Sequence, residues 1–351
     1  MFLHLHIDFM FKLFSNNKNK SKRNSSNRTK SGQIKEDQNI ENLGYRLSPE
    51  DKERMIFNPG KSLKSSREDV PKYLQNLSIN STATFLLTYS ISYIPGKISS
   101  AILASLADRG PVIFHNKIYF TNILGWERVD AISIFSAPLV VHFLEFVLFS
   151  YLFNVFKNRE GIFRLVFFWL FCHSLIRTIG FALPGIASNE EFGYLSGWLY
   201  FGSTTNYVIC FLSCVLVFLS SFVTLNFAIN TSYSKHLTYK KNRYRYISFL
   251  FGIPFIVGTT FITLLHLLDP ESFIRGQGSL NSIGESTHEL LHLLQFGIIY
   301  VGMLMFLSFF KEREFTTVRD LGQLKILKTW ILISLFGTIF IRFWLDKGWF
   351  W

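Results

Sequence analysis

The sequence predicts an all-α fold, a polytopic integral membrane helical bundle with six clear transmembrane helices and a weaker seventh. Composition is the first reason, because 49% of the 351 residues are hydrophobic and 39 are Phe, which is unusual for a soluble domain. The second is that several near-continuous apolar runs reach the roughly 20 residues that a helix needs to cross a bilayer core about 30 Å thick. Helices satisfy their own backbone groups, so a helical bundle is the expected architecture.

Six apolar runs are long enough to cross a membrane, and each is bounded by polar or basic residues. They cover residues 131–156, 163–184, 204–229, 246–268, 288–310 and 327–345. A seventh run, 83–106, is interrupted by Pro95 and Lys97. This run either crosses the membrane or lies in its interface, and we favour seven spans.

Loop charge predicts the orientation of these spans. The loop SYSKHLTYKKNRYRY (232–246) is rich in Lys and Arg and has no acid, which is typical of a cytoplasmic loop. The basic segments 157–164 and 311–328 fall on the same side by span counting. Seven spans then put the basic N-terminal tail inside and the short C-terminus outside. Two glycosylation patterns, Asn76-Leu77-Ser78 and Asn80-Ser81-Thr82, would instead need the tail outside, and we give more weight to the charge.

The chain is predicted to divide into a disordered cytoplasmic tail, residues 1–80, and the transmembrane bundle, residues 81–351. The tail is rich in Asn, Ser and Lys, and from Lys12 to Lys35 it carries eight Lys or Arg and no acid. Such a segment cannot form a core. Its charge favours contact with anionic lipid, and a merely solvated tail is the plain alternative.

Ionisable residues inside predicted spans are costly to bury and are therefore functional candidates. Glu145 and Arg177 lie at similar depths on consecutive spans, which predicts an intramembrane polar pair. This pair either fixes the register of the helices or takes part in transport or signalling. His142 shares a helix face with Glu145, and His173 shares one with Arg177. A lone membrane His is more often hydrogen-bonded to a neighbouring helix than a ligand.

The segment His288-Glu289-Leu290-Leu291-His292 matches the zinc-hydrolase pattern H-E-x-x-H. Two His one helical turn apart bind zinc, and the Glu between them serves as the catalytic general base. A third protein ligand is needed, and the sequence offers His266, Asp269 or His142 near the same membrane level. Zinc is therefore a possible cofactor, although the composition by itself requires none.

The same letters have a structural interpretation. Ser286-Thr287-His288-Glu289 is a capping-box pattern, so the segment also fits the first turn of a helix in the headgroup region. Acidic residues in a first turn suit the helix dipole. The pattern alone does not choose between a metal site and a helix start.

Two membrane families share part of this pattern. Intramembrane zinc proteases use H-E-x-x-H, but they place an Asp on a later span, whereas here the next acid is Asp346 at the end of the last span. The seven-span progestin/adiponectin-receptor and alkaline-ceramidase superfamily is similar in its late H-x-x-x-H. That superfamily carries the pair on its last span and a Ser-x-x-x-His pattern on an early one, which FWLFCHSLIRTIG does not reproduce. We assign the chain to neither.

Three functions fit these features. The first is a non-catalytic multi-pass membrane protein, such as a receptor-like module, scaffold or assembly subunit, and composition favours it. The second is a membrane-embedded zinc-dependent hydrolase of a lipid or peptide, with Glu289 as the base. The third is a transporter. The expected partners are the bilayer and a protein within it, not nucleic acid, since the net charge of +12 fits cytoplasmic loops. The location is the plasma membrane or an endomembrane.

Overall fold

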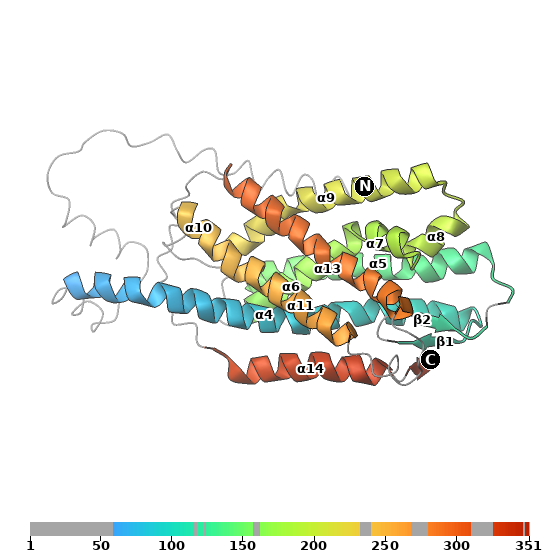
Figure 1. The fold of residues 1–351 in the computed structure, drawn as a ribbon, viewed down its shortest axis with the longest axis horizontal. Helices are drawn as coiled ribbons and strands as arrows, with labels where there is room; N and C mark the ends of the chain where they lie inside the picture. Colours follow the sequence, from blue (N-terminus) through green and yellow to red (C-terminus); the bar gives the residue numbers. More distant parts are fainter. Residues whose placement is uncertain are drawn as a thin grey trace. The chain divides into compact units, whose positions relative to one another are not determined.

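The computed structural model describes residues 59–114, 118–122, 124–156, 162–231, 240–267, 280–309, 326–346 and 348–350. The chain divides into two units, Met1–Ser65 and Ser66–Trp351, and every contact discussed below lies within the second. The unit is mostly helical (Figure 1). Its helices are α4 (Pro59–Leu106), α5 (Arg128–Phe156), α6 (Phe163–Ile179), α7 (Ala182–Ser188), α8 (Phe192–Trp198), α9 (Ser203–Asn230), α10 (Lys240–Ile247), the π-helix η2 (Ser248–Gly252), α11 (Ile253–Leu267), α13 (Leu280–Leu307) and α14 (Lys328–Asp346).

Five helical segments are long and apolar enough to cross a membrane. A sixth span results if α6 and α7, which meet at a bend of 57°, are counted together. These segments coincide in position with the six clear predicted spans and indicate an integral membrane protein in a lipid environment. They are Arg128–Phe156, Phe163–Ile179 with Ala182–Ser188, Ser203–Asn230, Asn242–Leu265, His288–Leu307 and Lys328–Leu345.

The exposed faces of these segments are apolar, as lipid-facing surfaces are. Leu144 on α5, Phe211 on α9 and Phe336 on α14 are each at least 60% exposed. In water such side chains would be an aggregation hazard, whereas acyl chains solvate them. Phe side chains therefore occur in two environments. Some are on the exposed apolar faces, and others, such as Phe85 and Phe296, are packed in the core with Trp169.

Helix α4 begins at Pro59, well before the predicted start of the bundle at residue 81. Its described side chains begin at Lys72, and Leu74, Leu77 and Asn80 are buried. Helix α4 thus extends into the predicted tail, where Leu74 and Leu77 are apolar residues at helical spacing in an Asn/Ser-rich context. The rest of the predicted tail, residues 1–58, lies outside the described residues.

The two glycosylation patterns fall on this buried part of α4. Asn80 is 0% exposed, and its Oδ1 accepts a hydrogen bond from the Leu327 backbone N–H at 3.1 Å. The neighbouring Ser81 is also fully buried. In the folded protein Asn80 therefore has a structural role at the start of α14, which is incompatible with a glycan at that position.

Helices α5, α7 and α11 each contain a proline whose missing N–H leaves the carbonyl four residues earlier without its helical donor. In each case a side chain from another helix donates to that carbonyl. The Ser81 hydroxyl donates to Leu250 O (2.7 Å, Pro254), the Ser100 hydroxyl to Ile134 O (2.8 Å, Pro138), and the Gln295 amide to Gly180 O (2.8 Å, Pro184). The prolines thus link α4 to α11 and α5, and α13 to the α6–α7 bend.

The π-helix η2 directly precedes Pro254, so the backbone widens where a normal helical hydrogen bond is lost. A Cβ at Gly252 would collide with the Tyr300 ring of α13, so the close approach of these helices requires glycine there. The Tyr300 hydroxyl and the Ser248 hydroxyl are 2.9 Å apart and bind each other. This pairing holds the entry to α11 against α13.

A small antiparallel sheet, in the order β2-β1-β3, corrects the all-α prediction. It consists of β1 (Pro111–Ile113), β2 (Ile118–Phe120) and β3 (Trp349–Phe350). The strands are too short for an alternating pattern to be recognised in sequence. Arg109 stabilises the adjoining turn by donating to Leu124 O and Gly125 O and by pairing with Asp130. The sheet joins the chain end after α14 to the connection between α4 and α5.

Candidate metal centre

His288, Glu289 and His292 lie in the interior of α13, which begins at Leu280. The capping-box interpretation of Ser286 is therefore wrong, because the helix has already run for two turns at that point. The i, i+4 spacing puts both imidazoles on one face, with ring centroids 4.9 Å apart. Both are buried, at 4% and 3% exposure.

The third member of the site is Glu191, in the turn between α7 and α8. Its backbone has φ +41°, and Asn189 two residues earlier has φ +56°, a region that non-glycine residues rarely adopt. The turn is tight, and the backbone at Gly193 passes so close to the Gly185 carbonyl that a Cβ there would collide with it. Strained backbone of this kind is concentrated at functional sites.

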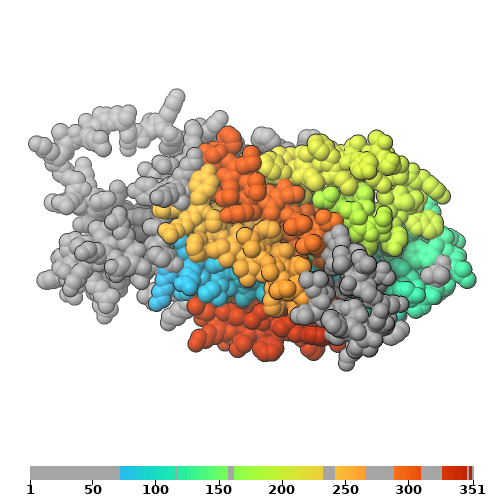
Figure 2. Space-filling view, in the orientation of Figure 1, coloured from blue at the N-terminus to red at the C-terminus, as the bar shows by residue number. Residues whose placement is uncertain are grey.

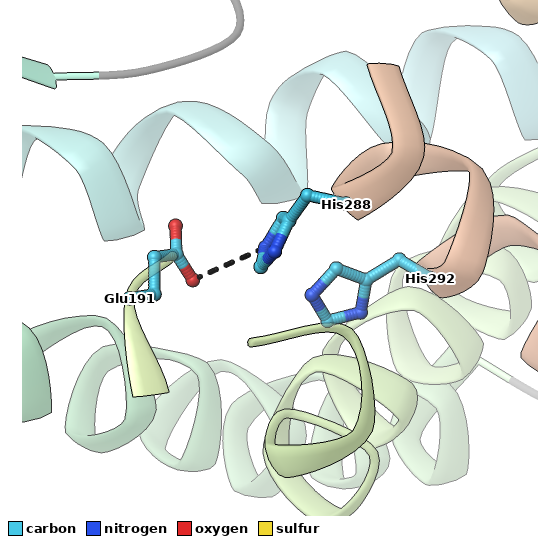
Figure 3. A group of neighbouring side chains, drawn as sticks. All are labelled: Glu191, His288 and His292. Atoms are coloured by element: carbon cyan, nitrogen blue, oxygen red, sulfur yellow. Dashed lines mark ion pairs between the residues drawn. The ribbon is translucent and has the colours of Figure 1, made fainter. Parts of the chain in front are cut away.

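Glu191, His288 and His292 each offer a ligand atom, and these atoms all lie within 4.8 Å of one another (Figure 3). Glu191 Oε2 is 3.5 Å from His288 Nε2. Ligands of a tetrahedral zinc ion, with bonds of about 2.0–2.2 Å, are roughly 3.3–3.6 Å apart. The Glu191–His288 pair already has this spacing, and a contraction of about 1 Å would bring the set around an ion.

Ser188 orients the first imidazole. Its hydroxyl is 2.9 Å from His288 Nδ1, at the end of α7. With Nδ1 engaged there, Nε2 is the nitrogen directed at Glu191. Outer-shell partners of this kind set the tautomer of metal-ligating histidines. The arrangement therefore presents a defined nitrogen to the centre of the cluster.

The second imidazole has an unsatisfied nitrogen. His292 Nδ1 is buried and has no hydrogen-bond partner among the described residues. An unpaired buried polar atom costs about 1–3 kcal/mol, so native structures rarely keep one without a compensating ligand. The His292 ring thus has one nitrogen without a partner among the described residues, and it offers one ring nitrogen to the cluster.

Two acids flank the first imidazole. Burial raises the pKa of Glu191, but the hydrogen bond and positive charge of His288 outweigh burial and bring the pKa well below its usual value. Burial raises the pKa of Glu190, and His288 opposes this rise only in part. Glu190 Oε2 is 3.9 Å from His288 Nδ1, the nitrogen that Ser188 also engages. Glu191 is therefore the acid that stays ionised beside the ligand nitrogen.

Glu289 is 2% exposed and faces α4 and α6. Its Oε2 accepts a hydrogen bond from the Tyr89 hydroxyl and is 3.9 Å from an Arg177 nitrogen. Arg177 also lies over the rings of Tyr89 and Tyr93, at 5.5 and 5.0 Å from their centroids. Arg177 therefore places a positive charge beside the Glu289 carboxyl group.

Other predicted members of the centre are distributed differently. Asp269 lies outside the described residues, as does the side chain of His266 at the end of α11. His142 is buried on α5, and its Nδ1 is 2.9 Å from Glu145 Oε2. The acid that joins the two histidines is instead Glu191, from the segment between the predicted spans 163–184 and 204–229. The adjacent acids Glu190-Glu191 in that loop were a sequence signal, but nothing in the pattern fixed their distance from α13.

The predicted Glu145–Arg177 pair has other partners in the described residues. Arg177 is the ion-pair partner of Glu289, whereas Glu145 binds His142 and accepts from Ser92 at 3.4 Å. Equal depth on consecutive helices did not determine which way the two side chains face. His173 is buried against aromatic rings, with Nε2 3.3 Å from Phe85 O, as the structural interpretation of a lone membrane His expects.

Comparisons of the chain with protein-family models, with curated proteins and with solved structures give no match.

Proposed function

We propose that the protein is a membrane-embedded metal-dependent hydrolase with a zinc site formed by Glu191, His288 and His292. The gathering of three potential ligand atoms from Glu191, His288 and His292 within 4.8 Å of one another is the observation that carries the proposal. It distinguishes the cluster from a self-sufficient ion pair, in which His288 and Glu191 alone would satisfy each other.

The donor set supports a catalytic rather than a structural metal. Structural zinc sites have four protein ligands, whereas catalytic sites have three and keep one position open. Two imidazoles and one carboxylate are a known catalytic set. Zinc in such a set acts as a Lewis acid and activates water near neutral pH.

Glu289 is the proposed general base. It follows the first ligand directly in the H-E-x-x-H pattern, and its contact with Arg177 favours the carboxylate. Tyr89 donates to the same oxygen and orients the group. Tyr89 and Arg177 are positioning residues in this proposal, and the lipid-facing helices around the centre imply a substrate drawn from the membrane.

Metal content and hydrolysis, measured on the same detergent-purified samples, test the proposal. Wild-type protein purified without chelator should carry close to one zinc per chain by mass spectrometry. The His288→Ala/His292→Ala double variant and Glu191→Ala should lose it, whereas Glu190→Gln should keep it. Glu289→Gln should keep zinc and lose hydrolysis of lipid esters, lipid amides or peptides, with Glu127→Gln as an activity control. Wild-type protein without zinc would overturn the proposal.

A second candidate is a non-catalytic membrane protein with a structural metal, the class that composition favours. The contact of Glu289 with both Tyr89 and Arg177 supports it, because this contact is a complete structural role for the carboxylate. The same measurement separates the two. Stoichiometric zinc without hydrolysis, and a loss of thermal stability rather than activity in Glu289→Gln, would favour this candidate.

A further inference from the structure

We infer that a cavity between α4, α11 and α14 binds the carboxylate or carbonyl end of a long acyl chain. The inference rests on the proposed function in one respect, since it makes an acyl lipid the substrate class of that site. The cavity has a volume of about 40 Å³. Its polar lining residues are Tyr89, Ser90, Tyr93, Thr338 and Arg342, and its apolar ones are Ile262, Leu265, Ile341 and Leu345.

The size of the cavity limits what enters it. A buried water needs roughly 10–15 Å³ on this measure, so the cavity accommodates about three water-sized groups. That matches a carboxylate or an ester carbonyl with its first methylene. A complete acyl chain does not fit, and the remainder of the chain has to lie outside the cavity.

The polar side of the cavity suits an acyl oxygen. Arg342 is 8% exposed, and it is close enough to Tyr89 to interact with it electrostatically. The Tyr93 hydroxyl is buried and has no hydrogen-bond partner among the described residues. A guanidinium binds a carboxylate through charge-assisted hydrogen bonds, and a tyrosine hydroxyl adds a further donor.

The apolar side of the cavity is formed by two candidate membrane spans. Ile262 and Leu265 belong to α11, and Ile341 and Leu345 to α14, both of which are candidate membrane spans. Figure 2 shows the N-terminal part of the coloured α4, in blue, between the orange α10–α11 region and the red α14. A chain anchored at Arg342 would therefore pass between two lipid-facing helices, where acyl chains already are.

Tyr89 and Tyr93 connect this cavity to the candidate metal centre. Both line the cavity, and their rings stack with centroids 6.0 Å apart at 13°. The Tyr89 hydroxyl also donates a hydrogen bond to Glu289, the proposed base. Tyr89 thus contacts both the cavity and the proposed base of the candidate metal centre.

Binding of a fluorescent long-chain fatty acid to chelator-treated protein tests the inference without metal or turnover. We expect wild type to bind the acid, and Arg342→Gln to bind it about tenfold more weakly, as loss of a charge-assisted hydrogen bond predicts. A fatty alcohol of equal length should compete about tenfold less well than the acid. An acyl ester competes if the site accepts the carbonyl of an intact lipid, and fails to compete if it holds only the free acid.

Two variants keep the test decisive. Ile341→Phe fills the cavity without changing charge and should also weaken binding, so a misfolded Arg342→Gln protein would not end the test. Lys328→Gln removes an exposed charge from the same helix and should bind like wild type. Equal affinity for acid and alcohol, or full affinity in Ile341→Phe, would overturn the inference. The His288→Ala/His292→Ala variant should retain binding, so failure of the metal proposal is seen separately.

Discussion

The candidate metal centre can be compared with the three proline breaks, which are the carbonyls freed by Pro138, Pro184 and Pro254. The freed carbonyls all have hydrogen-bond donors, whereas one nitrogen of the metal centre has no partner among the described residues. At each of three breaks a freed carbonyl receives a side-chain donor from another helix at 2.7 or 2.8 Å. At the centre, His292 Nδ1 is equally buried and receives nothing from the described residues. Other buried side-chain atoms of the described residues also lack a hydrogen-bond partner, such as Gln295 Oε1, but among these atoms His292 Nδ1 alone belongs to a residue of the candidate metal cluster.

Zinc should give the largest effect that separates the two regions. A ligand at 100 times its dissociation constant stabilises the folded state by about 2.7 kcal/mol, so zinc should raise the Tm of wild type. The proline breaks bind no metal, and Gln295→Leu should show the same increase relative to its own zinc-free Tm. Thermal unfolding in detergent with and without zinc measures this. An equal increase in His288→Ala/His292→Ala would mean that zinc binds elsewhere.

Replacing one polar side chain in each region without metal is the next test. Gln295→Leu leaves Gly180 O without its donor and should lower the free energy of unfolding by about 1–3 kcal/mol. His292→Leu removes a nitrogen that bonds nothing, and should cost less or stabilise the protein. Chelator-treated samples unfolded side by side give both values. If His292→Leu were the more damaging of the two, the imidazole would have a structural partner after all.

Ser188→Ala should weaken zinc binding without abolishing it. The hydroxyl holds His288 Nδ1, and loss of such an outer-shell partner typically costs about 10–100-fold in metal affinity. Competition with a chelator of known affinity measures the change. Ser196→Ala, a buried serine on α8 that bonds Gly193 O, is the matched control and should leave affinity within about twofold of wild type. An unchanged affinity in Ser188→Ala would remove this residue from the site.

The smallest expected effect concerns one proline break. Ser81→Ala should destabilise the protein by about 1–2 kcal/mol while Pro254 is present, because Leu250 O then lacks a donor and Trp169 Nε1 lacks an acceptor. In a Pro254→Ala background the backbone N–H can serve that carbonyl, so the same change should cost less, and the cost that remains is that of the unpaired Trp169 Nε1–H. A double-mutant cycle measured by thermal unfolding gives this coupling. If the effects of Ser81→Ala and Pro254→Ala on stability were strictly additive, the contribution of the Ser81 hydrogen bond would not depend on Pro254.

The predicted elements differ in how far the structure supports them. The six apolar segments coincide in position with the predicted spans, since their length and hydrophobicity are local properties of the chain. The i, i+4 face of His288 and His292 was predictable for the same reason. The start of α4 was not, because Leu74 and Leu77 are isolated among polar residues and their burial depends on neighbouring helices.

What the sequence by itself determined is therefore the class of protein: apolar helices of membrane-crossing length, and two histidines and an acid on one of them. What only the tertiary structure decided is which distant groups meet there. Glu191 reaches His288 through a strained turn between α7 and α8, and Arg177 pairs with Glu289 rather than Glu145. The physical reason is that helix formation and bilayer preference act along the chain, whereas ligand sets and ion pairs depend on helix rotation and packing.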